Sequence, residues 1–206
     1  MAKAKTPVPD DDTRTRILHA ALAEFAEHGF DGARMRDIAE RARANLGLLT
    51  YYFRDKDRLW RAAVSAAFER LQRELAEVIT PRPEDDERVE LTRFVERFVR
   101  FVARNPEFMR LMNDEGKRDG PRMRWLADRY VRPLYDVIRT RVEHAQASGL
   151  LPPIHPAHLH YLVVGAAGLV FSQAAECKRV TGIDPTTDTF ADAHAAAIVQ
   201  LLSGLR

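Results

Sequence analysis

Cysteine is almost absent from this chain, whose 206 residues include only Cys177. A single thiol excludes any disulfide within the chain and is typical of a reducing compartment, so we expect a cytoplasmic protein. A disulfide between two copies of the chain through Cys177 stays open. Hydrophobic residues make up 46% of the sequence and charged residues 30%, which excludes a disordered or collagen-like chain and predicts a globular protein with a buried core.

The sequence also lacks a large excess of charge of either sign. Its 32 Lys and Arg residues against 30 Asp and Glu residues leave a net charge of +2. A total this small does not by itself indicate a nucleic-acid partner. Any such function must follow from where the charges lie along the chain.

Long hydrophobic runs are missing as well. The stretch 157–175 carries no Asp, Glu, Lys or Arg, but its strictly apolar part spans only residues 161–171. A membrane span needs about 20 mainly apolar residues. We therefore expect no membrane association and interpret the stretch as a helix buried between other helices. The N-terminus has no apolar segment typical of a signal peptide.

Motifs of catalysis are absent. The sequence contains no GxSxG, HExxH, P-loop or GxGxxG pattern. His155, His158 and His160 raise the question of a metal, but their spacing places only the first two on one helical face, and His155 is expected to cap the helix. The sequence therefore predicts no enzyme, no cofactor and no metal site.

Helical spacing of apolar residues runs from one end of the chain to the other, with no convincing period-2 strand. Proline and glycine mark the helix ends, and Pro133 is expected to kink or divide its helix. The sequence predicts an all-α protein of about nine helices. These are expected near residues 13–29, 34–42, 46–53, 55–79, 84–104, 106–116, 121–148, 156–181 and 188–202, with a break at 80–83.

The first three helices are a long one followed by two short ones, with a tight turn at 41–45 between the short helices. This arrangement is typical of a helix-turn-helix, whose second short helix enters the major groove of DNA. We expect Leu49 and Phe53 to anchor that helix against Ile38 and Phe25. The rest of the helix is then partly free, and Gly47 would allow close approach to the duplex.

An ordered set of residues between Thr13 and Leu59 supports this interpretation. Its members are Arg16-Ile17-Leu18 with Ala20-Ala21, Phe25-Ala26 with Gly29-Phe30, Arg36-Asp37-Ile38-Ala39, Asn45 with Gly47, and Tyr51-Tyr52-Phe53 followed by Lys56. This set resembles the DNA-binding domain of the TetR family of transcriptional repressors, and the match has no gaps. Beyond about residue 75 the chain is similar to the family in architecture only.

Four positions depart from the family pattern. Ala33 stands where the family usually has a Thr that caps the second helix, so Asp31 or a water must replace the cap, or the contact is missing. Arg43 stands where Gly is usual, and we expect it to adopt a conformation outside the left-handed region and to reach phosphate. Thr50 and Tyr52 replace the usual Tyr and His, so no relative's operator can be transferred.

Basic residues flank the two short helices, where a DNA backbone would pass. The resemblance implies that Tyr51 and Lys56 contact phosphate, while Thr50 and the apolar Leu46 and Leu48, suited to thymine methyls, face bases. Packing or a surface role stays open as the alternative for these side chains. The predicted DNA-binding residues are Arg34, Arg36, Arg43, Asn45, Leu46, Gly47, Leu48, Thr50, Tyr51, Tyr52 and Lys56.

The uncharged helix carries a stripe of small residues and one tyrosine, which permits close approach of a second helix. The resemblance implies a homodimer formed by the last two long helices, and a two-fold dimer suits a palindromic operator. Packing within one chain is the alternative. The predicted interface residues are Tyr161, Gly165, Gly168, Ser172 and Ala175.

Aromatic and methionine side chains gather in the C-terminal part, where core packing is the simplest explanation for each. The resemblance implies a cavity there for a small-molecule effector of unknown identity, which opposes operator binding. The predicted pocket residues are Phe94, Phe98, Phe101, Met109, Met112, Trp125, Tyr130 and Phe171.

These patterns together predict three parts. They are a flexible arm at 1–12, a helix-turn-helix domain that binds double-stranded DNA at 13–59, and a helical effector-binding and dimerisation domain at 60–206. We expect a homodimeric repressor of a palindromic operator that a small molecule releases. A helical small-molecule-binding protein that activates transcription, or that has no DNA function, is the alternative.

Overall fold

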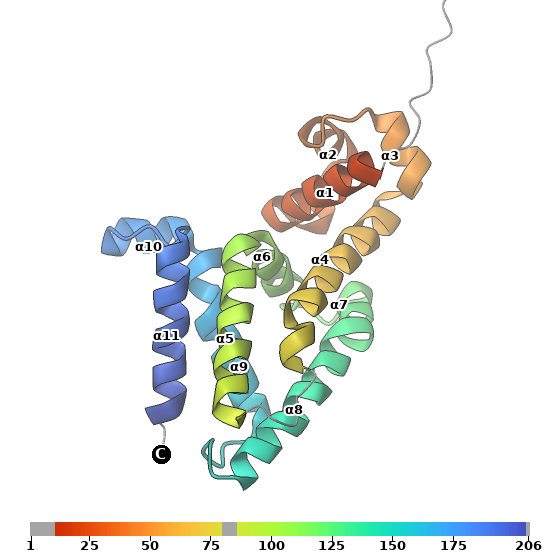
Figure 1. Ribbon diagram of the computed structural model, residues 1–206. Helices are drawn as coiled ribbons and strands as arrows, with labels where there is room; N and C mark the ends of the chain where they lie inside the picture. Colours follow the sequence, from red (N-terminus) through yellow and green to blue (C-terminus); the bar gives the residue numbers. More distant parts are fainter. Residues whose placement is uncertain (1–10, 80–85, 205–206) are drawn as a thin grey trace, which may run out of the picture. The chain divides into compact units, whose positions relative to one another are not determined.

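The computed structural model describes residues 11–79 and 86–204. All regular elements in these ranges are helical, as Figure 1 shows, which confirms the predicted all-α class. The predicted break at 80–83 lies outside the described residues, as does the predicted arm except for its last two residues, which begin the first helix. The chain divides between Ala67 and Phe68 into two compact units.

The first unit contains three helices and the first half of a fourth. These are α1 (Asp11–Gly32), α2 (Met35–Arg41), α3 (Leu46–Phe53) and the start of α4 (Lys56–Ile79). The second unit contains the end of α4, then α5 (Glu87–Arg104), α6 (Pro106–Glu115), α7 (Pro121–Leu126), the π-helix η1 (Ala127–Val131), α8 (Arg132–Ala147), α9 (Pro156–Ser172), α10 (Ala174–Thr181) and α11 (Asp188–Gly204).

Two long helices expected from the sequence are subdivided in the structure. The segment 121–148 forms α7, η1 and α8, because Pro133 has no N–H to donate and the wider π-helix directly before it accommodates the missing bond. The segment 156–181 forms α9 and α10, which are separated at Gln173 by a non-helical backbone (φ −113°, ψ 36°). The expected number of about nine helices was therefore too low.

The core of the first unit is made by the apolar faces of its helices. Ile38 and Leu49 are fully buried, and Phe25 and Phe53 are nearly so, which confirms the predicted burial of the α3 anchors. Gly29 interrupts the helical backbone of α1 with φ 68° and ψ 173°, close to the predicted end of that helix. The sequence pattern therefore predicted correctly which face of α3 turns inward.

A buried carboxylate links α1 to α2. Glu24 is 5% exposed, and Arg41 binds it at 3.3 Å and Glu27 at 3.0 Å. A buried charge is tolerated only when an opposite charge accompanies it. Arg41 therefore stabilises the packing of α2 on α1, and its charge is already engaged within the domain.

The turn after α2 closes in a way that the sequence did not predict. Ala44 N–H donates to Ala39 O and Arg43 N–H donates to Glu40 O, both at 2.9 Å, which is the hydrogen-bond pattern of a Schellman motif. This motif requires a left-handed residue after the helix, and Arg43 supplies it with φ 51°. The expectation that Arg43 would avoid this region was wrong, because the turn itself dictates the backbone.

In the second unit, α11 and α9 both pack on α5 (Figure 1). Val95, Val99 and Val102 of α5 are buried in this core together with Ala167 of α9 and Ile198 of α11. None of the described helices is long and apolar enough to cross a membrane.

The left-handed arginine leads to a stability prediction. We expect Arg43→Gly to raise the free energy of unfolding by about 1 kcal/mol, because a side chain in this region costs roughly 1–2 kcal/mol and glycine adopts it freely. Urea unfolding followed by circular dichroism measures the change. Arg43→Ala removes the charge but keeps a Cβ, so it is the matched control; equal stability of the two variants would contradict the strain at this position.

Candidate nucleic-acid interface and ligand cavity

Helix α3 is held at both ends by local hydrogen bonds. At its start, the Asn45 side-chain oxygen accepts a hydrogen bond from Leu48 N–H at 2.8 Å. At its end, Asp55 N–H donates to Phe53 O at 2.7 Å around Arg54, whose φ of 63° and ψ of −55° form a tight γ-turn. The side-chain oxygen of Asn45 therefore caps the helix, and α3 is fixed as a short rigid element.

The outward face of α3 is mostly apolar. Leu46 is 40% exposed and Tyr51 is 69% exposed, and Gly47 and Thr50 lie on the same exposed side. Thr50 Oγ1 donates to Leu46 O at 3.0 Å, so its methyl group and oxygen lone pairs remain for a partner. Leu48 and Tyr52 are half-buried, and the Tyr52 ring packs between those of Tyr51 and Phe53.

The first turn of α4 begins beside the end of α3. Asp55 caps it by accepting a hydrogen bond from Arg58 N–H at 2.8 Å. Lys56 donates to Asp31 O at 3.1 Å, and its ammonium lies 4.8 Å from the centre of the Phe30 ring. These contacts hold a positive charge at the N-terminus of α4, where free N–H groups also favour an anion.

Three predicted arginines surround these short helices, and all three are exposed. Arg34 occupies the N-cap of α2 with an extended backbone, and no side chain caps this helix. Of the alternatives left open for Ala33, neither Asp31 nor any other described side chain supplies the cap, and Ala33 itself is buried. Arg36 lies on α2, and Arg43 lies in the turn that follows it. All eleven predicted DNA-binding residues thus fall between the start of α2 and the start of α4.

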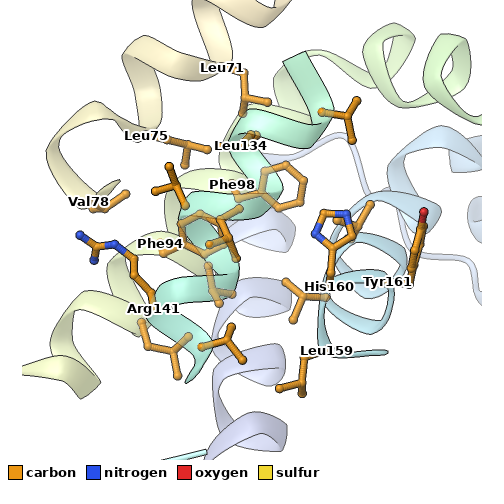
Figure 2. A pocket seen from close by; sticks show the side chains of 18 of the residues that line it. Leu71, Leu75, Val78, Phe94, Phe98, Leu134, Arg141, Leu159, His160 and Tyr161 are labelled. Atoms are coloured by element: carbon orange, nitrogen blue, oxygen red, sulfur yellow. The ribbon is translucent and has the colours of Figure 1, made fainter. Parts of the chain in front are cut away.

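The second unit contains a large cavity of about 1120 Å³. Figure 2 shows side chains from α4, α5, α8 and α9 around it. One face of α5 and one face of α8 each line it over three turns, and most of the lining is apolar. The lining residues include Leu71, Leu75, Val78, Leu91, Phe94, Phe98, Met109, Met112, Leu134, Val137, Ile138, Arg141, Leu159, His160 and Val164.

Only half of the predicted pocket residues line this cavity. Phe94, Phe98, Met109 and Met112 belong to its wall. The other four lie outside this wall, and their rings pack against neighbouring aromatic rings. Phe101 meets Phe108, Tyr130 stacks on Phe68 at 4.6 Å, Trp125 meets Tyr130, and Phe171 meets Phe190 and lines a smaller pocket of about 290 Å³.

The cavity also has polar residues that were not predicted from the sequence. Glu90 and Arg141 line it and form an ion pair at 2.9 Å, with Glu87 and His144 paired at 2.7 Å one turn away. The i, i+3, i+4 spacing of residues 87, 90, 91, 94 and 98 was the available signal, since it places both glutamates on the face of Phe94. Aromatic content alone did not reveal this face.

His160 lies in the cavity wall rather than in a histidine cluster. His155 caps α9 by accepting a hydrogen bond from Ala157 N–H, as expected, and His158 is exposed. The ring of His160 is half-buried and meets the rings of Tyr135 and Tyr161 edge-on. Burial lowers the pKa of its imidazole below the ordinary value, so the ring is neutral near pH 7.

The predicted dimer stripe is divided between two faces of α9 and α10. Tyr161 and Gly165 are exposed on α9, and Ala175 is exposed on α10. Gly168 is buried instead, because it packs on Met109, and an added Cβ would lie 2.5 Å from the Met109 Cε. Ser172 is half-buried and donates to Leu169 O. The exposed stripe of α9 consists of Tyr161, Leu162, Gly165, Ala166 and Leu169.

Two family descriptions match most of the chain. "Bacterial regulatory proteins, tetR family" matches residues 17–63, and "Tetracyclin repressor-like, C-terminal domain" matches residues 88–202. The first match covers the helix-turn-helix and the beginning of α4. The second covers α5 to α11, the helices that supply most of the cavity wall.

Relatives and solved structures agree with these matches. The transcriptional repressor SCO4008 of Streptomyces coelicolor is 31% identical over 187 residues, which cover 87% of this chain and 90% of that protein. The structure of AibR in complex with isovaleryl coenzyme A and operator DNA is similar in fold (TM-score 0.73, 17% identity, 93% and 98% of the two chains). A TetR-like regulator from Rhodococcus sp. RHA1 is similar too (TM-score 0.67, 22% identity, 95% and 96%).

These matches extend over both units of the chain and over the elements described above. The protein belongs to the TetR family of bacterial transcriptional regulators, whose members are DNA-binding regulators rather than enzymes.

Proposed function

We propose that this regulator is a cytoplasmic repressor that binds a palindromic operator as a homodimer and leaves it when a small molecule fills the cavity of the second unit. The observation that carries the proposal is the orientation of α3. Leu49 and Phe53 are buried, so Leu46, Gly47, Thr50 and Tyr51 face outward. The names of SCO4008, a repressor, and of AibR, bound to operator DNA, support this function.

The chemistry of the eleven predicted residues suits three roles in DNA binding, which are phosphate contacts, base contacts and support of α3. Arg34, Arg36, Arg43, Lys56 and the hydroxyl of Tyr51 suit phosphate contacts, which supply most of the affinity. The apolar Leu46 and the Thr50 methyl suit thymine methyl groups in the major groove. Gly47 lets the backbone approach, Asn45 holds the start of α3, and the half-buried Leu48 and Tyr52 shape the face from behind.

Two neighbouring exposed stripes support the homodimer. On α9 the stripe includes Leu162 at 59% and Leu169 at 53% exposure, and on α11 Ala193, Ala196, Ala197 and Leu201 are exposed. The two helices contact each other, with His194 of α11 donating to Ala166 O at 2.7 Å. Pairing these stripes with those of a second copy would bury several large apolar side chains in a four-helix arrangement, each contributing about 1.5–3 kcal/mol when fully buried.

The proposed phosphate contact is tested by a charge-neutral variant. We expect Lys56→Gln to weaken binding to duplexes selected from a random pool and to non-selected duplexes alike, because a phosphate contact carries no sequence information. The slope of log affinity against log salt should become shallower by about 0.9. Fluorescence anisotropy at several salt concentrations gives both quantities.

Arg58→Gln is the matched control, since Arg58 lies in the same helical turn and pairs with Asp55. It should keep the wild-type slope. An unchanged slope in Lys56→Gln, with helicity intact, would remove Lys56 from the interface.

The dimer is tested on the exposed stripe of α9. We expect the double variant Leu162→Asp, Leu169→Asp to be a folded monomer in light scattering, because both side chains are more than half exposed within one chain. It should also lose affinity for the palindromic site, since a monomer contacts only one of the two half-sites. Val89→Asp, an exposed valine on α5, should remain dimeric. A dimeric double variant would place the interface elsewhere.

Effector and operator must oppose each other by the same factor. We expect any cavity ligand that lowers operator affinity by a given factor to bind the operator complex more weakly by that factor, because coupling between two sites is reciprocal. Anisotropy with ligand and calorimetry with and without operator measure the two factors. A ligand that fills the cavity and leaves operator affinity unchanged would separate the cavity from regulation.

A further inference from the structure

The charged side chains around the cavity already have partners. Glu90 and Arg141 form an ion pair at 2.9 Å, and each is less than one-third exposed. Glu87 pairs with His144 at 2.7 Å and accepts a hydrogen bond from Ser148 Oγ at 2.6 Å. At another part of the wall, Lys117 pairs with Asp114 at 3.2 Å.

This pairing disfavours an ionic ligand. A charged group that enters the cavity would have to lose its hydration and either remain unpaired or break one of these pairs, which leaves another charge uncompensated. An uncharged apolar molecule pays neither cost, and the aromatic and aliphatic wall favours it through removal of apolar surface from water.

His160 is an uncharged polar residue of the cavity wall. Figure 2 shows the imidazole of His160 pointing into the cavity from α9. Among the described residues its ring contacts are the edges of Tyr135 and Tyr161, and no hydrogen bond joins either of its nitrogens to another described residue. A neutral imidazole offers one donor and one acceptor. His160 can therefore satisfy a hydroxyl, a carbonyl or an amine N–H of a bound molecule.

We propose that the cavity takes an uncharged, mainly apolar molecule that places one hydrogen-bonding group against His160. The proposal rests on the proposed function in that this molecule is the effector. It differs from a coenzyme A ester or a free fatty acid anion, because both carry charge that the paired lining leaves without a counter-ion. The lowered pKa of His160 agrees with this choice, since a neutral ring brings no positive charge for an anion.

A matched pair of fluorescent probes tests the charge preference. N-phenyl-1-naphthylamine is uncharged and has one N–H, and 1-anilinonaphthalene-8-sulfonate adds only a sulfonate to the same rings. We expect the uncharged probe to bind at least about tenfold more tightly. As competitors of the uncharged probe, 1-decanol should displace it, whereas decanoate and decylamine, with the same chain and opposite charges, should each require about tenfold higher concentration.

Variants of His160 test the polar contact. We expect His160→Phe, which keeps a ring but has no hydrogen-bonding atom, to weaken binding of the uncharged probe about tenfold, because the buried N–H of the probe loses its acceptor. His160→Gln supplies an acceptor again and should recover most of the affinity. His158→Phe, the exposed neighbour two residues away, should bind as the wild type does. Thermal unfolding by circular dichroism checks that each variant is folded.

Three results would overturn the proposal. They are equal affinity for the charged and uncharged probes, no loss of affinity in His160→Phe, and no binding of any probe. Each leaves the DNA-binding part of the proposed function standing, because operator binding is measured without ligand. If the unliganded wild type bound no operator DNA, the proposed function would instead be contradicted. The probe affinities would still test the ligand preference of the cavity.

Discussion

The helix-turn-helix depends on a backbone constraint at the two ends of α3. Between α2 and α3 the chain must turn within four residues, and the hydrogen bonds that close this turn require a positive φ at Arg43. After α3, Arg54 takes a second positive φ before Asp55 caps α4. These two turns fix the direction of α3, so that Leu49 and Phe53 point inward and Leu46 and Tyr51 outward. Arginine at both positions keeps two exposed cations beside α3 while straining the backbone.

In the first unit the buried side chains could be predicted from the sequence, whereas the backbone of the turn could not. The burial of Phe25, Ile38, Leu49 and Phe53 follows from helical periodicity, and it was predicted correctly because periodicity decides which face turns inward. The backbone at Arg43 was not, because an arginine at a position that favours glycine hides the left-handed turn. The ion pair of Arg41 with Glu24 joins α2 to α1 across seventeen positions, and such pairing is set by packing that no local pattern records.

In the second unit the helices could be predicted from the sequence, whereas the cavity lining could not. The helices were predicted, but all eight pocket residues were assigned by side-chain type, and type does not distinguish a cavity wall from a core. Phe101, Tyr130 and Phe171 are large and apolar like Phe94, yet they pack against other rings and do not line the large cavity. The difference lies in the tertiary arrangement of α5 and α8. Polar lining residues such as Arg141 and His160 were missed for the same reason.

Gly168 links the cavity to the exposed face of α9. On one side it contacts Met109, a wall residue of the cavity, so closely that no side chain larger than hydrogen fits without displacing the methionine. On the other side of the same helix lie Leu162, Ala166 and Leu169, the exposed stripe. Close-packed interiors pass on displacements instead of absorbing them. A molecule that moved Met109 would therefore press on the α9 backbone. Gly168, which was predicted as a contact between two chains, lies within one chain against the cavity wall.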